Sequence, residues 1–124
     1  MTNKHESETN GLSLGPNQSL VVDDQRQLAR VDLKDATASV LTETDRVYTD
    51  LAISPDGDIF ASTFNGLFNI DPKTFQETEV GSFDTSVNAL TFDSAGNLHV
   101  ADLSGNVFSV DPTTGASTSV AQTV

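Results

Sequence analysis

Short runs of alternating apolar and polar residues recur along the chain, separated by turns rich in glycine, proline, asparagine and aspartate. Alternation with a period of two is typical of strands that bury one face. Residues 51–81 contain four such runs in succession, and the last of them is largely polar. The pattern therefore predicts four short antiparallel strands joined by tight turns, with the fourth strand at an edge that faces water.

Residues 90–121 repeat this pattern. Leu51 recurs as Leu90, and Leu67 recurs as Val107, one position later than the repeat requires because Asn106 is an insertion. A period of about 40 residues with four short strands in each unit is the signature of a β-propeller blade. The apolar first strand of each unit is then expected next to the propeller axis.

A third, degraded unit precedes these two. Sliding the repeat back by one period places Leu12 under Leu51 and residues 20–22 under residues 59–61. Gln18 replaces Gly57 at a turn that favours positive φ, which weakens this hairpin. We therefore predict an all-β fold, a partial β-propeller of about three four-stranded antiparallel blades. The blades are expected at about 11–49, 50–88 and 89–124, after a disordered arm at 1–10.

The turns have recognisable chemistry. Residues 55–58, Pro-Asp-Gly-Asp, provide a fixed φ, a side-chain acceptor and a glycine for the left-handed position. Asn65-Gly66 is a strong hairpin signal. Asp-Pro pairs at 71–72 and 111–112 are expected to end the third strand of their units. The corner that follows has Gly115 in the third unit, but Phe75 stands at that position in the second.

These corners resemble those of bacterial β-propeller repeat proteins, a broad group that includes NHL-like, lactonase-like and quinoprotein-like propellers. The residues that carry the resemblance are Ile53-Ser54-Pro55-Asp56-Gly57, Asp71-Pro72 with Thr74, and Asp111-Pro112-Thr113-Thr114-Gly115. The resemblance covers about residues 11–124 and implies the propeller architecture. It implies no single function, because the group contains sugar lactonases, other hydrolases and many binding scaffolds.

Charge narrows the range of partners. The chain has 18 acidic and 6 basic residues and a formal net charge of −12, which disfavours nucleic acid and anionic membrane surfaces as partners. It has no cysteine, and its two histidines do not have a zinc-ligand spacing. The amino-terminal residues lack the apolar region of a Sec signal peptide. A soluble chain is therefore expected, either cytoplasmic or exported without an amino-terminal signal.

Three blades raise a packing problem, because closed propellers have about 4 to 8 blades. The two outermost blades would each leave an apolar face in water. The free-energy cost is about 25 cal/mol per Å² of apolar surface that stays exposed. Further blades in a longer chain would cover these faces, and so would a homodimer that forms a six-bladed ring. An open, marginally stable stack of three blades is the third alternative.

Propeller sites lie at the mouth of the central channel. The residues expected there are Asp45, Tyr48, Asp50, Asp84, Asn88 and Asp102, together with Ser86 and Asn106. Ca²⁺ takes about six to eight oxygen ligands, and Asp50, Asn88 and Asp102 are candidates for this role. By resemblance, lactonase-like propellers use such an ion to polarise a lactone carbonyl. The alternative, which the pattern favours, is that these residues form turns and solvated charge.

No catalytic constellation is evident in the sequence. His99 alternates with apolar neighbours on a predicted strand, with no Ser or Cys nucleophile and third orienting group. Glycine-rich phosphate-binding motifs are missing. The sequence therefore predicts a non-catalytic propeller module, without a required cofactor, that binds a protein, glycan or small ligand or serves as a structural scaffold. The alternative is a divalent-metal-dependent hydrolase of lactonase type with its site at the channel mouth.

Overall fold

A computed structural model describes residues 9–14, 19–23, 25–32 and 34–122 of the chain, and the regular elements within them are all strands. The first sheet contains β1 (Thr9–Leu14), β2 (Ser19–Asp23), β3 (Gln27–Asp32) and β4 (Thr37–Glu43). The second contains β5 (Asp50–Ile53), β6 (Ile59–Ser62), β7 (Gly66–Ile70) and β8 (Glu77–Ser82). The third contains β9 (Val87–Phe92), β10 (Leu98–Asp102), β11 (Asn106–Val110) and β12 (Ser117–Gln122).

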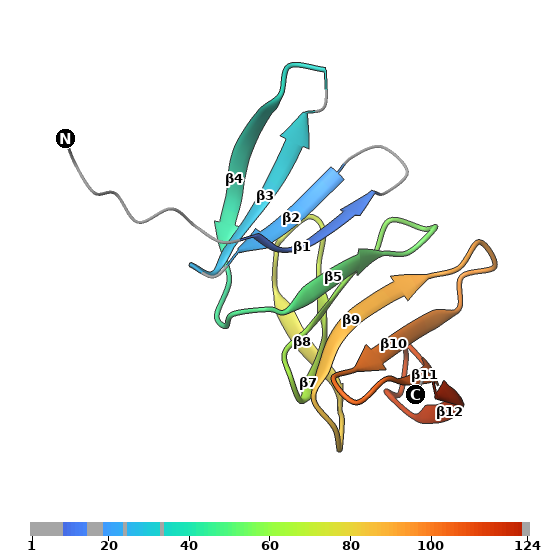
Figure 1. Ribbon diagram of the computed structural model, residues 1–124. Helices are drawn as coiled ribbons and strands as arrows, with labels where there is room; N and C mark the ends of the chain where they lie inside the picture. The colour runs from blue at the N-terminus through green and yellow to red at the C-terminus, as the bar shows by residue number, and fades with distance from the viewer. Residues whose placement is uncertain (1–8, 15–18, 24, 33, 123–124) are drawn as a thin grey trace.

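Each sheet is an antiparallel meander in which every strand pairs with the next one along the chain. The sheets fan out around one line, where the first strands of the three sheets, β1, β5 and β9, lie side by side (Figure 1). This arrangement confirms the predicted all-β partial propeller of four-stranded antiparallel sheets. Of the predicted arm, residues 1–8 lie outside the described part, whereas Thr9 and Asn10 belong to β1. The described residues contain no helix able to cross a membrane.

The inner strands approach one another closely. A Cβ atom on Gly11 would lie 2.5 Å from the Asp50 side chain and 2.7 Å from the Asp50 Cα. The Ser13 hydroxyl accepts a hydrogen bond of 3.1 Å from the Ile53 amide, and Asp50 Oδ2 accepts one of 2.9 Å from the Leu90 amide. The side chains of Ser13 and Asp50 therefore link β1 to β5 and β5 to β9, where no continuous ladder of main-chain hydrogen bonds joins the neighbouring strands.

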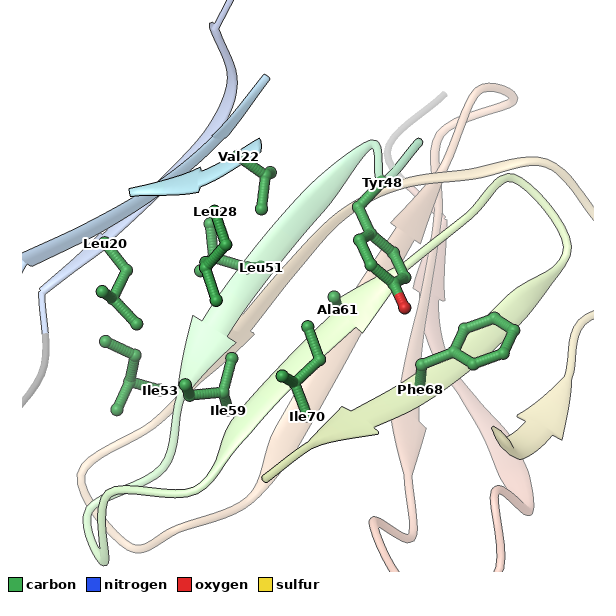
Figure 2. Packing of buried hydrophobic residues seen from close by; sticks show 10 residues of the cluster. All are labelled: Leu20, Val22, Leu28, Tyr48, Leu51, Ile53, Ile59, Ala61, Phe68 and Ile70. Carbon is green, nitrogen blue, oxygen red and sulfur yellow. The ribbon is translucent and has the colours of Figure 1, made fainter. Parts of the chain in front are cut away.

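The interior consists of two apolar layers, one in each gap between neighbouring sheets. The layer between the first and second sheets contains Leu20, Val22, Leu28, Tyr48, Leu51, Ile53, Ile59, Ala61, Phe68 and Ile70 (Figure 2). The layer between the second and third sheets contains Ala52, Phe60, Leu67, Val87, Leu90, Leu98, Val100 and Val110. The second sheet is thus buried on both faces, which explains why every residue of β6 is buried.

The predicted alignment of the first unit is wrong by one residue in β2. Val21 lies opposite Leu12, whereas the repeat alignment would place Val22 there. A slip of one residue turns every side chain of a strand to the other face. Here it directs Leu20 and Val22 toward the second sheet, where both are buried. Burial of these two side chains is the physical reason for the slip.

The corner between the third and fourth strands has the same backbone in all three sheets. Its φ is 55° at Ala36, 62° at Phe75 and 80° at Gly115. Phe75 therefore occupies the conformation expected of glycine, and its ring packs against the core between the first and second sheets. The hydrogen bonds from the amides of Lys73 and Thr74 lower the pKa of Asp71. At each corner an aspartate accepts such bonds from the amides two and three residues later; these are Asp32, Asp71 and Asp111.

The hairpin predicted at Asn65-Gly66 is confirmed, but its loop lies earlier than a turn centred on that pair. Gly66 is already the first residue of β7, and the Thr63 amide donates a hydrogen bond of 3.0 Å to the Gly66 carbonyl. Neither Asn65 nor Gly66 has a positive φ. The turn before β6 does use the left-handed conformation, because Gly57 has a φ of 94°.

Candidate functional site

One end of the inner strands is framed by two kinds of loop. The connections from β4 to β5 and from β8 to β9 lie beside the loops that join the second and third strands of the sheets. The Phe64 carbonyl accepts a hydrogen bond of 2.8 Å from the Val87 amide, and the Ser86 carbonyl accepts one of 2.9 Å from the Leu103 amide. These main-chain bonds hold the loops and connections together as a rim.

A pocket of about 460 Å³ opens within this rim. It is lined by Asn10, Val47, Thr49, Phe64, Asn88 and Leu103. Three of the lining residues, Asn10, Thr49 and Asn88, follow one another at intervals of one repeat, at or near the start of an inner strand. Phe64 and Leu103 are also one repeat apart, and 53% and 63% of their respective surfaces are exposed. The lining therefore repeats from sheet to sheet.

The polar residues of this pocket also connect neighbouring sheets. Asn10 Nδ2 donates a hydrogen bond of 2.9 Å to the Tyr48 carbonyl. The Thr49 hydroxyl shares its proton between the Ser62 carbonyl of its own sheet, at 3.1 Å, and the Val87 carbonyl, at 3.3 Å. Tyr48 and Val87 each stand just before the next member of the series. Asn88, the third member, is exposed, and its side chain has no hydrogen-bond partner among the described residues.

Of the residues predicted at the mouth, Asn88 lines this pocket, and the others are not among its lining residues. Asp45 and Asp84 are exposed on the connections. The Asp45 amide donates a hydrogen bond of 2.7 Å to Glu77 Oε2, so its main chain is tied to the start of β8.

Tyr48 is buried in the core between the first and second sheets, where its ring meets Phe68 edge to face at 5.8 Å (Figure 2). Its hydroxyl donates to Glu77, and Arg46 contacts the same carboxylate at 3.0 Å while lying 4.2 Å above the Phe68 ring. Burial, and then the hydrogen bond to Glu77, raise the pKa of Tyr48 above its usual range. This network joins the connection between β4 and β5 to β7 and β8.

Asp50 lies between the inner strands. Its carboxylate accepts hydrogen bonds of 2.8 Å from the Leu51 amide and 2.9 Å from the Leu90 amide. Burial raises the pKa of Asp50 despite these two bonds. Both oxygens are engaged by main-chain donors, so the side chain acts here as a bridge from β5 to β9.

Asp102 organises the turn between β10 and β11. Its Oδ1 accepts hydrogen bonds of 2.9 Å from the amides of Ser104 and Asn106, and its Oδ2 accepts from the Asn106 side chain at 3.0 Å and from Thr85 at 2.7 Å. These bonds, those from Asn106 first, lower the pKa of Asp102 to about 2. Asp102 and Asn106 are therefore turn residues that also hold the connection at Thr85.

No group of three or more histidine, aspartate or glutamate side chains with the geometry of a metal site occurs within the described residues. His99, on β10, lies 3.2 Å from Asp93, a carboxylate whose pKa is lowered to about 2, chiefly by its hydrogen bonds with Asn97. Calcium binding by Asp50, Asn88 and Asp102 stays a prediction.

Sequence reasoning missed most of the pocket lining, namely Asn10, Val47, Thr49, Phe64 and Leu103. A signal for four of these residues was present, because all but Val47 stand at equivalent positions of the repeat. Carboxylates are the usual candidates for chemistry, whereas the residues that repeat around this mouth are uncharged.

No protein-family model and no curated protein matches the sequence. Among solved structures, the chain is similar to virginiamycin B lyase from Staphylococcus aureus, a β-propeller, with a TM-score of 0.68 and 14% identity over 96% of this chain and 43% of that one. A structural genomics protein of unknown function from Bacteroides thetaiotaomicron has the same TM-score and identity, over 98% of this chain and 33% of that one. The chain thus spans less than half the length of either structure, and the likeness shows the propeller fold.

Proposed function

We propose that this chain is a non-catalytic β-propeller module that acts as a binding scaffold, with its ligand site in the pocket at the mouth. The observation that carries the proposal is the lining itself. The lining combines the amides of Asn10 and Asn88 and the hydroxyl of Thr49 with the apolar side chains of Val47, Phe64 and Leu103, and none of these six side chains is titratable. Such a lining provides orientation and apolar contact rather than acid–base chemistry.

The ligand class follows from the same residues. Ligand pockets measure about 300–1,000 Å³ and combine apolar walls with a few polar groups, and the present pocket of about 460 Å³ has both features. An amide can donate and accept hydrogen bonds at once, which suits hydroxyl groups. Phe64 offers an exposed ring to an apolar ligand face. A neutral ligand with hydroxyls and an apolar face, such as a small glycan, fits this combination.

We also infer that the blades belong to the Asp-Pro-x-Thr-Gly repeat type and that the chain contributes three of them. The support is the common corner, in which an aspartate binds two following amides and the last corner residue has positive φ. An Asn or Gly in place of Ala36 or Phe75 would suit this conformation better, so the first two corners are divergent members of the series.

Binding is tested by titrating the protein with a panel of neutral mono- and disaccharides while recording amide chemical shifts. Shift changes are expected at the six pocket residues. Asn88→Ala and Phe64→Ala should each weaken binding about tenfold, the loss of one good contact. Gln122→Ala, an exposed amide on the outer strand β12, is the matched control and should leave the affinity unchanged. Shift changes confined to other parts of the protein, or equal losses for all three variants, would contradict the proposal.

A further inference from the structure

The first sheet has an uncovered apolar face. Leu12 and Leu14 on β1 are 60% and 68% exposed. Their equivalents one repeat later, Leu51 and Ile53, lie in the core between the first and second sheets. The exposed pair therefore has the side chains of an inter-sheet core without a neighbouring sheet to cover them.

The third sheet has the complementary uncovered face. A hollow of about 160 Å³ lies on β9, β10 and β11, and its lining includes Thr91, His99 and Val107. On the outer strand β12 of the same sheet, Val120 is 58% exposed, although Val80, its equivalent in the second sheet, packs against the core between the second and third sheets. This face of the third sheet is thus equivalent to the face of the second sheet that packs against the third sheet. The equivalents of the three lining residues all belong to that core; they are Ala52, Phe60 and Leu67.

The occupied gaps show what fits such a hollow. Leu90 on β9 and Leu67 on β7 share the core between the second and third sheets. Val107 is the equivalent of Leu67 one repeat later, and Leu12 is the equivalent of Leu90 two repeats earlier. Leu12 is therefore equivalent to the residue that packs against such a face inside the chain. It lies exposed on the first sheet, at the other end of the row of sheets.

The hydrogen bonds that connect neighbouring inner strands also form a series that a second copy would continue. Asn10 donates to the carbonyl that precedes Thr49, and the Thr49 hydroxyl reaches the carbonyl that precedes Asn88 at 3.3 Å while also donating to Ser62. Asn88, the third donor, has no partner among the described residues, and Thr9 precedes Asn10 as Tyr48 precedes Thr49. The carbonyl of Thr9 on a second copy is thus the acceptor that continues the series.

We propose that a second copy of this chain covers both free faces, head to tail, so that two copies close a six-bladed ring. Leu12 and Leu14 of each copy pack on the free face of the third sheet of the other, which includes the hollow and Val120, and Asn88 of each donates to the Thr9 carbonyl of the other. Six blades lie within the range of about 4 to 8 that closed propellers have. The twofold axis runs along the central channel, and both interfaces continue the packing already present inside each chain.

Three variants with the same charge change and nearly equal starting exposure test this arrangement by light scattering. Two copies of the 13.1 kDa chain have a mass of about 26 kDa, expected for the unmodified protein. Leu12→Glu and Val120→Glu place a charge on the two opposite faces and should each give a mass of about 13 kDa. Phe64→Glu, on the rim at the gap between the second and third sheets of the same chain, lies outside both free faces and should remain at about 26 kDa. Circular dichroism checks that all three variants retain their strands.

Mixing the two interface variants distinguishes this ring from pairing of like faces. A mixture of Leu12→Glu and Val120→Glu has one undamaged interface in each heterodimer, so a species of about 26 kDa should reappear. A monomer of the unmodified protein at all concentrations would overturn the proposal, as expected if further blades of a longer chain cover the faces instead. Dissociation by only one of the two interface variants would overturn it as well, because it indicates like-face pairing.

Discussion

At the residue scale, the corner positions show how one backbone conformation accepts different side chains. Gly115 adopts positive φ at little cost, whereas Ala36 and Phe75 must hold a Cβ in the left-handed region. Phe75 recovers part of this cost by packing its ring against the core between the first and second sheets. Ala36 is exposed and has no such compensation. The first corner is therefore locally strained.

Ala36→Gly should relieve this strain and raise the free energy of unfolding by about 0.5–1 kcal/mol, the left-handed penalty less the greater chain entropy of glycine. Urea denaturation monitored by circular dichroism measures the change. Ala38→Gly is the control, because Ala38 is also exposed but has ordinary strand φ on β4, and it should lower stability by about 0.5–1 kcal/mol. Equal losses for the two variants would show that Ala36 is not strained.

At the scale of elements, the close contact of β1 with β5 requires a residue without a side chain. The positions equivalent to Gly11 are Asp50 and Ala89, so a Cβ is compatible with the inner-strand backbone itself. At Gly11, however, a Cβ would lie 2.7 Å from the Asp50 Cα and 3.0 Å from the Leu51 nitrogen. The obstacle is a neighbouring main chain, which cannot move aside like a flexible side chain.

Gly11→Ala should therefore separate β1 from β5 and lower the free energy of unfolding by about 2–3 kcal/mol, as other overpacked substitutions do. Thermal and urea unfolding measure the loss. Gly57→Ala is the comparison, since a Cβ there meets nothing within 4 Å and the residue has a φ of 94°. Its cost comes from φ alone and should be about 1 kcal/mol. Similar losses for the two variants would argue against a steric cause at Gly11.

At the scale of the whole molecule, charge acts against assembly. Each chain has a formal net charge of −12, so two copies that meet through apolar faces bring twice that charge together. Mobile ions screen such repulsion, because the Debye length falls from about 10 Å at 0.1 M salt to about 3 Å at 1 M. The proposed ring is thus favoured by salt as well as by burial of apolar surface.

Raising NaCl from about 0.05 M to about 0.5 M should lower the dissociation constant of the proposed dimer about tenfold. Sedimentation equilibrium at several concentrations measures this constant. Phe64→Glu adds one negative charge to each chain outside the free faces and should steepen the dependence of the dissociation constant on salt. A dissociation constant that rises with salt would indicate that ion pairs, rather than apolar contacts, join the copies.

The sequence by itself determined the features that depend on neighbouring residues. Alternating runs predicted the strands of the second and third sheets, and Asp-Pro pairs predicted the corners at Asp71 and Asp111, because an aspartate binds the amides that follow it. The repeat of about 40 residues predicted the partial propeller. The insertion at Asn106 was also visible, because it lengthens the period by one position.

Only the tertiary structure decided which side chains meet across the gaps between sheets. It shifted β2 by one residue so that Leu20 is buried, a choice that depends on the facing second sheet rather than on local preference. It assigned Asp50 and Asp102 to main-chain donors, and it brought the uncharged Asn10 and Thr49 to the mouth beside Asn88. A repeat specifies equivalent positions along the chain, but contacts between sheets depend on distances that exist only after folding.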